Sequence, residues 1–317
     1  MPRIAVVVPC HNEESAIAKV VCSFREFLPD ATIVVADNAS TDDTAGRARD
    51  AGAIVLTESR LGKGMAVRRL LSDVEADCYI MVDGDGTYDA ASAPEMARHV
   101  LEDGVDMVVA ARVVPGSDRG GEYRRGHEFG NRVLSGIFSR LFGLEMKDTL
   151  SGYRAFSRRF VKSFPATPEG FEVEAELNAH AALLGVRITH VESTYVSRPL
   201  GSESKLSTYR DGIRILRRNL KLFRDARPLL AFSCLATPWL IAAAVLIGVP
   251  VVEYFTTGFV LRFPTLIAGV TCLLISTNLW VVGLILDRVA RNRAEATRLA
   301  YLALHAPIES AHLRLPC

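Results

Sequence analysis

Two long stretches without a charged residue constrain this chain more than any other feature. They run from Leu229 to Val252 and from Phe263 to Leu286, and each is 24 residues long. About 20 apolar residues are enough to cross the hydrocarbon core of a bilayer, whereas a buried helix of a soluble protein normally carries some polar face. The sequence therefore predicts two transmembrane helices, residues 229–252 and 263–286, joined as a hairpin.

The basic residues around these stretches predict the orientation of the hairpin. Residues 210–227 contain seven Arg and Lys side chains and residues 288–298 contain four arginines, while the connector 253–262 is nearly uncharged. Positively charged flanks stay in the cytoplasm. The run after Met1 also reads as a strand and not as a cleaved signal. We expect a multi-pass protein of the cytoplasmic (inner) membrane, with both termini in the cytoplasm.

The rest of the chain divides around the hairpin. Residues 1–207 are long enough for one large domain. In residues 208–228 apolar and basic side chains alternate at roughly helical spacing, which predicts an amphipathic helix at the membrane surface. The alternative is a cytosolic helix whose apolar stripe packs on the domain. Residues 287–317 are expected to form a short cytoplasmic tail.

Strand-like and helix-like segments alternate through the first 113 residues. Strands are expected at 4–8, 32–36, 53–57, 78–82 and 106–110, with helices at 15–28, up to Gly52, at 65–74 and at 94–101. This alternation is typical of right-handed βαβ units. The predicted fold class is therefore α/β, with a mostly parallel sheet.

Polar residues follow four of the predicted strands. They are Asn12 and Glu13, Asp37, Asp83 with Asp85, and Arg112. The carboxyl ends of parallel strands meet at one edge of a sheet, and ligands bind beyond that edge. Four such coincidences on one sheet predict a ligand site. Taken singly, Asp37 is equally explained by an Asx turn, and Glu13 by first-turn helix charge.

Asp83 and Asp85 are separated by one glycine, Gly84. Two carboxylates at this spacing can reach one hard cation, and the glycine lets a ligand approach closely. Mg²⁺ or Mn²⁺ held in this way takes its other ligands from water and substrate phosphates. The alternative is a solvated Asp-Gly turn. In the same way, Lys63 between two glycines is either a site residue or a solvated loop residue.

Composition and spacing exclude several classes of protein. The formal net charge of +1 argues against nucleic-acid binding. The six cysteines have no metal-like spacing, which argues against a zinc site or a disulfide framework. The loop around Lys63 lacks the spacing of a Walker P-loop, and no GxGxxG follows the first strand. Neither an ATPase nor a nicotinamide enzyme is favoured.

Taken together, these segments resemble glycosyltransferase family 2. The resemblance rests on residues 7–14, Asp37, the loop 62–64 and residues 83–86. Residues 148–156 and 198–207 resemble the branch that acts on polyprenyl phosphates, which includes dolichol-phosphate mannose synthase-like and undecaprenyl-phosphate glucosyltransferase-like enzymes. The match covers residues 4–207 and implies the GT-A nucleotide-sugar-binding fold. Arg154, inside the segment 148–156, is otherwise explained as a salt-bridged surface arginine.

The resemblance implies roles for the matching residues. The nucleotide-binding set is Pro9, His11, Asn12, Glu13, Asp37, Lys63, Asp83 and Gly84. The metal and diphosphate pair is Asp83 and Asp85. The catalytic set is Asp85, Arg112, Arg125, Asp148 and Lys205, with Arg124 as the alternative to Arg125. Residues 116–126 read as a mobile loop over the site.

The resemblance implies transfer of one sugar from a nucleotide-diphosphate sugar to a polyprenyl (undecaprenyl) phosphate. UDP-glucose is the favoured donor among UDP- and GDP-hexoses, and single displacement inverts the anomeric centre. A phosphate acceptor is already ionised near neutral pH, since its second pKa is about 6, and needs no strong base. An alcohol acceptor would need one, and Asp148 or Glu174 are the candidates.

Two other functions stay open from the sequence. A processive polysaccharide synthase should carry a Gln-x-x-Arg-Trp motif, but the chain contains no glutamine. A non-catalytic membrane scaffold would not need the acids and Lys205 together. The expected partners are the nucleotide sugar, the polyprenyl phosphate and the bilayer. A homo-oligomer is also possible through small and polar residues of the second stretch, namely Gly269, Ser276, Thr277, Asn278 and Gly283.

Overall fold

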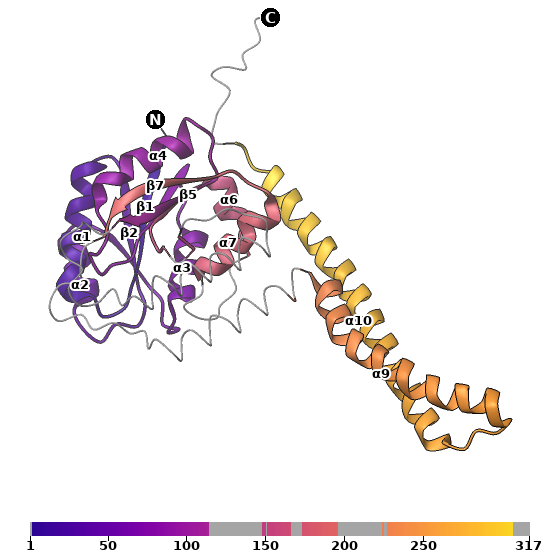
Figure 1. Ribbon diagram of the computed structural model, residues 1–317. Helices are drawn as coiled ribbons and strands as arrows, with labels where there is room; N and C mark the ends of the chain where they lie inside the picture. The colour runs from indigo at the N-terminus through magenta and orange to yellow at the C-terminus, as the bar shows by residue number, and fades with distance from the viewer. Residues whose placement is uncertain are drawn as a thin grey trace, which may run out of the picture. The chain divides into compact units, whose positions relative to one another are not determined.

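The computed structural model describes residues 2–113, 148–149, 151–165, 173–195, 224 and 227–306. The chain divides into two compact units. The first consists of Met1–Leu216 together with Thr297–Cys317, and the second is Arg217–Ala296. The first unit holds a β-sheet with its covering helices, and the second holds two long helices (Figure 1).

The sheet has seven strands in the order β3-β2-β1-β4-β6-β5-β7. Their bounds are β1 Ile4–Cys10, β2 Thr32–Asp37, β3 Ile54–Thr57, β4 Cys78–Met81, β5 Met107–Val113, β6 Arg154–Ser157 and β7 Ile188–Thr194. Strand β6 runs antiparallel to β4 and β5, and all other neighbours pair in parallel. The predicted α/β class with a mostly parallel sheet is confirmed.

Helices cover both faces of this sheet (Figure 1). One apolar cluster contains residues of α1 (Glu14–Phe27), α2 (Thr44–Asp50) and α4 (Ala93–Leu101), the last following the short η1 (Ala90–Ser92). The other contains residues of α3 (Lys63–Asp73), α6 (Arg158–Ser163) and α7 (Val173–Leu184). Strands buried on both faces read as continuous apolar runs, which is why the central ones are visible in the sequence.

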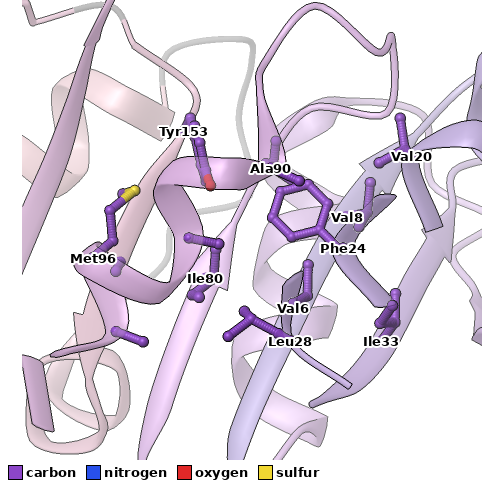
Figure 2. Packing of buried hydrophobic residues seen from close by; sticks show 14 of the residues in the cluster. Val6, Val8, Val20, Phe24, Leu28, Ile33, Ile80, Ala90, Met96 and Tyr153 are labelled. Carbon is purple, nitrogen blue, oxygen red and sulfur yellow. The ribbon is translucent and has the colours of Figure 1, made fainter. Parts of the chain in front are cut away.

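Helix α1 shows how the local sequence produces this packing. Ile17, Val20, Val21 and Phe24 recur at helical spacing and are buried. Phe24 lies among side chains of β1 and β4, and its ring and that of Tyr153 form a T-shaped pair with 5.9 Å between their centroids (Figure 2). Burying each side chain of this size contributes about 1.5–3 kcal/mol.

The five predicted strands are present, and their bounds differ from the prediction by a few residues at most. Three of these differences affect site residues. Asp37 is the last residue of β2 and does not follow it. Pro9 is buried inside β1, where it pairs with Ala36, and does not follow the strand. Strand β5 continues to Val113, so Arg112 is a strand residue. Strands β6 and β7 have no counterpart in the prediction.

The second unit contains α9 (Pro228–Thr257) and α10 (Phe263–Leu302) as far as Ala296, and both helices are long and apolar enough to cross a membrane. A Cβ on Gly269 would lie 2.7 Å from Ile247 Cγ1, and one on Gly283 would lie 2.9 Å from Phe232 Cβ. Ser276 Oγ donates to the Ala236 carbonyl at 3.1 Å. These small residues, suggested above for association between chains, therefore allow α9 and α10 to approach within one hairpin.

Several predictions concern residues that the structure does not describe. They are the loop 116–126 with Arg124 and Arg125, the segment 198–207 with Lys205, and nearly all of the amphipathic segment 208–228. These stay predictions. Helix α10 continues past Leu286 to Leu302, so the expected tail 287–317 begins as helix.

Candidate active site

The parallel strands β1, β2, β4 and β5 end at the same edge of the sheet. Cys10 is the last residue of β1, and the pKa of its thiol depends on the charges at this edge. Burial raises the pKa of the Cys10 thiol well above its usual range, and the carboxylates of Glu13, Asp83, Asp37 and Asp85 raise it further. Four acids from three strand ends therefore lie close enough to Cys10 to act on its thiol.

The loops after β1 and β2 interlock. His11 Nδ1 lies 2.8 Å from the Asn38 carbonyl oxygen, and the Thr41 backbone N–H donates to Asn12 Oδ1 at 2.8 Å. The Glu13 N–H donates to Thr44 Oγ1 at 2.9 Å. These bonds hold Asn12 in the left-handed region, with φ of 55°. The predicted nucleotide-binding residues after β1 are thereby fixed beside the loop after β2.

Asn38 holds this edge to the loop before α3, a role that sequence reasoning missed. Its Nδ2 donates to the carbonyls of Arg60 at 2.6 Å and Glu58 at 3.2 Å, and its Oδ1 accepts from the Gly62 N–H at 2.7 Å. The side chain is 2% exposed. Its place directly after Asp37 was the available signal, but alone it indicates no more than a turn.

Asp37, the last residue of β2, has an unusual environment for a carboxylate. It is 8% exposed, and its Oδ1 is buried without a hydrogen-bond partner among the described residues. An unpartnered buried acceptor costs about 1–3 kcal/mol, and more for a charged group. A ligand that offers an N–H or O–H here would recover that free energy.

Lys63, the first residue of α3, bridges two carboxylates. Its Nζ lies 2.5 Å from Asp83 Oδ1 and 2.6 Å from Glu174 Oε1. Burial alone would lower the pKa of Lys63, but the charges of Asp83 and Glu174 hold it well above its ordinary value. The bridge brings Glu174, in the first turn of α7, to the strand edge across 111 residues of sequence.

Two glycines let the backbone pack closely around Asp83. A Cβ on Gly152 would lie 2.3 Å from Asp83 Oδ2, and one on Gly84 would lie 2.4 Å from Cys10 Sγ. Asp85 is 5% exposed, and its Oδ1 accepts from the backbone N–H and the hydroxyl of Thr87 at 3.2 and 2.7 Å. These contacts restrict where each carboxylate can point.

Arg112 and Asp148 form a bidentate ion pair at the same edge. Nε and Nη2 of Arg112 donate to the two Asp148 oxygens at 2.7 and 2.9 Å. The guanidinium also lies 5.5 Å from the Tyr195 ring centroid. Tyr88 lies close by: burial raises the pKa of its hydroxyl, and so does the charge of Asp83. The structure thus brings Asp148 to Arg112, two residues predicted separately.

Arg154 is buried and forms no salt bridge with any residue that the structure describes, which corrects the surface reading. It is 0% exposed within β6. Its Nε donates to the Ser151 carbonyl at 2.8 Å, its Nη2 donates to the Thr149 carbonyl at 2.9 Å, and its Nη1 donates to Asn178 Oδ1. Arg154 therefore fixes the turn that delivers Gly152 against the Asp83 carboxylate.

The donor set at this edge suits a hard divalent ion. Asp83 and Asp85 offer carboxylate oxygens, the ligand type that Mg²⁺ and Mn²⁺ prefer. Within the described ranges, no cluster of three or more His, Cys, Asp and Glu side chains forms a complete metal cage. An ion held here would therefore need further ligands from a bound phosphate and water, which is common for Mg²⁺.

Comparisons with known proteins agree with this geometry. The family described as Glycosyl transferase family 2 matches residues 5–164. Glycosyltransferase AglJ of Haloferax volcanii is 38% identical over 227 residues, which cover 71% of this chain and 72% of AglJ. The undecaprenyl-phosphate mannosyltransferase of Micrococcus luteus is 27% identical over 222 residues, which cover 65% and 88% of the two chains.

Solved structures show the same architecture. Glucosyl-3-phosphoglycerate synthase from Mycobacterium tuberculosis, crystallised with Mn²⁺ and uridine-diphosphate-glucose, aligns with a TM-score of 0.54 and 28% identity. The alignment covers 68% of this chain and 78% of that one. The sheet and its helices are therefore of the GT-A type. The chain belongs to glycosyltransferase family 2 and is a glycosyltransferase.

Proposed function

We propose that this glycosyltransferase moves one sugar from a nucleotide-diphosphate sugar to a polyprenyl phosphate, with inversion and with the help of a divalent ion. The observation that carries the proposal is the pairing of both candidate bases with cations. Asp148 is held by Arg112, and Glu174 by Lys63. A carboxylate whose oxygens already accept from a guanidinium or an ammonium group is poorly placed to take a proton from an alcohol acceptor. The site is therefore better suited to an acceptor that arrives already ionised, such as a phosphate monoester.

The nucleotide is proposed to bind over the ends of β1 and β2. Asp37 Oδ1 is buried and has no hydrogen-bond partner within the described part of the chain, and the N–H of a uracil or guanine edge would supply a donor. His11, Asn12 and Glu13 lie beside it on the interlocked loops. Pro9, Lys63 and Gly84 complete the proposed nucleotide-binding set.

The diphosphate is proposed to lie against Asp83 and Asp85. A divalent ion bound there would neutralise the charge that develops on the leaving nucleotide diphosphate. Arg112 lies at the same edge, and it is proposed to orient an acceptor phosphate electrostatically. Arg125 and Lys205 are proposed to add further positive charge from segments outside the described residues. Positioning by cations then replaces proton abstraction.

The membrane arrangement is also a proposal. Helices α9 and α10 are long and apolar enough to span a bilayer, and the basic residues on both flanks favour a cytoplasmic location for the catalytic unit. The name of the Micrococcus luteus relative includes a polyprenyl phosphate, which supports the same acceptor class here. We propose that the acceptor reaches the site from the cytoplasmic leaflet of the inner membrane.

The donor sugar is proposed to be glucose carried by UDP. The solved neighbour contains uridine-diphosphate-glucose and Mn²⁺, which supports both parts of the donor and the choice of ion. The relative named as a mannosyltransferase makes a GDP- or UDP-linked hexose the nearest alternative.

The test is a transfer assay with purified protein. The protein is incubated with undecaprenyl phosphate, Mn²⁺ or Mg²⁺, and a panel of radiolabelled UDP- and GDP-sugars. We expect label in the lipid extract from one donor, and none after chelation with EDTA. Asp85→Ala should abolish the signal, whereas the matched control Asp50→Ala, at an exposed residue of α2, should retain it. Lipid label that persists in Asp85→Ala would refute the proposed metal role.

A further inference from the structure

The C-terminal end of α10 belongs to the catalytic unit. Thr297 and the residues after it group with Met1–Leu216, whereas Arg217–Ala296 form the second unit. Among residues 287–306, all of which are described, Tyr301 is the one buried side chain, at 8% exposure. Leu299 and Leu302 beside it are 68% and 62% exposed. Tyr301 is therefore the side chain of this end whose burial needs an explanation.

Tyr301 enters a polar socket built from residues far away in the sequence. Asp106, which precedes β5, is 3% exposed. Ser157 Oγ and Arg159 Nε each donate to Asp106 Oδ1 at 2.7 Å, and Arg159 Nη2 donates to Oδ2 at 2.8 Å. Tyr301 Oη donates to the same Oδ2 at 2.7 Å, across 195 residues of sequence. An ionised carboxylate has about four acceptor positions, so Tyr301 completes the set.

The Tyr301 ring is held as well as its hydroxyl. The Arg159 guanidinium lies 4.6 Å from the ring centroid, a distance at which cation–π attraction operates. The ring belongs to the apolar cluster that contains Phe156 and Phe160. Burial and the hydrogen bond to Asp106 raise the pKa of Tyr301, so the hydroxyl stays protonated and remains a donor.

This socket is separate from the candidate active site. Asp106 lies at the amino end of β5, whereas Arg112 lies near its carboxyl end. Parallel strands place these ends at opposite edges of a sheet. Tyr301 is therefore no candidate for contact with the substrates, and its burial requires another explanation.

We propose that residues 297–302 are a docking segment, whose Tyr301 seats in the socket of Asp106, Ser157 and Arg159 in the same chain. The chain leaves the catalytic unit before α9 and re-enters it at Thr297. The catalytic unit is thus tied to the hairpin at both ends, by the covalent linker before α9 and by this docked turn after it. The inference does not depend on the identity of donor or acceptor.

The test cuts the covalent connection between the catalytic unit and α9, and measures whether the contact of Tyr301 keeps the two fragments together. A protease site is inserted after Leu216, where the first stretch of the catalytic unit ends, and the folded full-length protein is purified in detergent and cleaved. We expect the two fragments to elute together in size-exclusion chromatography. Tyr301→Ala should make them dissociate at least about tenfold faster, because it removes both the ring and the hydroxyl. Tyr301→Phe, which keeps the ring, should give an intermediate rate.

Leu299→Ala is the matched control, since it shortens an exposed side chain on the same turn and should leave the dissociation rate unchanged. The N-terminal fragment released from Tyr301→Ala should rebind a wild-type C-terminal fragment, which shows that the fragment is still folded. Separation of the wild-type fragments on cleavage would overturn the proposal. Equal retention of wild-type and Tyr301→Ala fragments would also overturn it.

Discussion

Gly84 between the two site acids offers a sharp test of the packing at the strand edge. A Cβ on Gly84 would lie 2.4 Å from Cys10 Sγ, while the next atoms, Cys10 Cβ and Val8 Cγ1, are both 3.6 Å away. The sulfur would have to retreat by about 1 Å to reach ordinary contact, and Cys10 is 3% exposed in a close-packed cluster. Gly84→Ala should therefore be destabilised by about 1–3 kcal/mol through overpacking.

Removing the sulfur should rescue this variant. In Gly84→Ala with Cys10→Ala, the new methyl group meets atoms at 3.6 Å, which is ordinary contact. Cys10→Ala alone should cost about 1 kcal/mol for the small cavity it leaves. The double variant should therefore be more stable than Gly84→Ala, with a coupling energy of about 1–2 kcal/mol.

Two measurements test whether Cys10→Ala rescues Gly84→Ala. Thermal unfolding of the four proteins in detergent gives the coupling energy from the double-mutant cycle. Calorimetric titration with UDP and Mn²⁺ should show affinity lost in Gly84→Ala and regained in the double variant, because Gly84 joins the two acids. If the double variant unfolds as early as Gly84→Ala and binds as weakly, the contact with Cys10 is not what makes glycine necessary.

Three further outcomes follow from the structure. Gly152→Ala should displace the Asp83 carboxylate by about 1 Å and lower the transfer rate by about 10²-fold. The control Gly248→Ala should keep the wild-type rate, because a Cβ there meets no atom within 4 Å. Equal rates for the two variants would contradict the packing argument. Arg154→Met should lower the free energy of unfolding by about 3 kcal/mol or more, since buried acceptors lose their donors. Chemical denaturation measures this free energy, and an unchanged midpoint would contradict the stabilising role of the Arg154 hydrogen bonds. Burial lowers the pKa of His180 to about 4 from its usual value of 6.5, so only the unfolded chain gains this proton between those values. Stability should fall by about 3 kcal/mol as the pH drops from 6.5 to 4, and His180→Gln should lack that part of the slope; identical pH profiles for the two proteins would refute it.

The central strands and the edge where they end could be predicted from the sequence. Strands β1, β2 and β4 are apolar runs closed by polar residues, because burial on both faces leaves no alternation to read. Asp37 and Asp83 therefore stood out as the first polar residues after the apolar runs of β2 and β4, and Asn12 and Glu13 as polar residues soon after β1. The same logic placed Arg112 just beyond β5, whereas it lies inside that strand.

Strand β6 could not be predicted in this way. It is four residues long, and its first residue, Arg154, is a charged side chain that is fully buried. Buried arginines are rare, so a sequence pattern favours the surface for such a residue. What makes burial possible is a set of acceptors contributed by Thr149, Ser151 and Asn178, and periodicity does not carry that information.

The partners of the site residues were equally hidden. Lys63 meets Glu174 across 111 residues, and Asp106 meets Tyr301 across 195. Each residue alone is equally well explained as a solvated charge or an ordinary core side chain. Only the folding of the sheet brings the two members of each pair together.

The central claim is that Asp83 and Asp85 hold a divalent ion beside a nucleotide whose base meets Asp37. The most direct measurement is a structure of the protein with UDP and Mn²⁺, in which the anomalous signal locates the ion. We predict the ion within about 2.0–2.6 Å of a carboxylate oxygen of Asp83 or Asp85, and a base N–H within hydrogen-bond distance of Asp37. An ion bound elsewhere, or both carboxylates turned away from the nucleotide, would contradict the account.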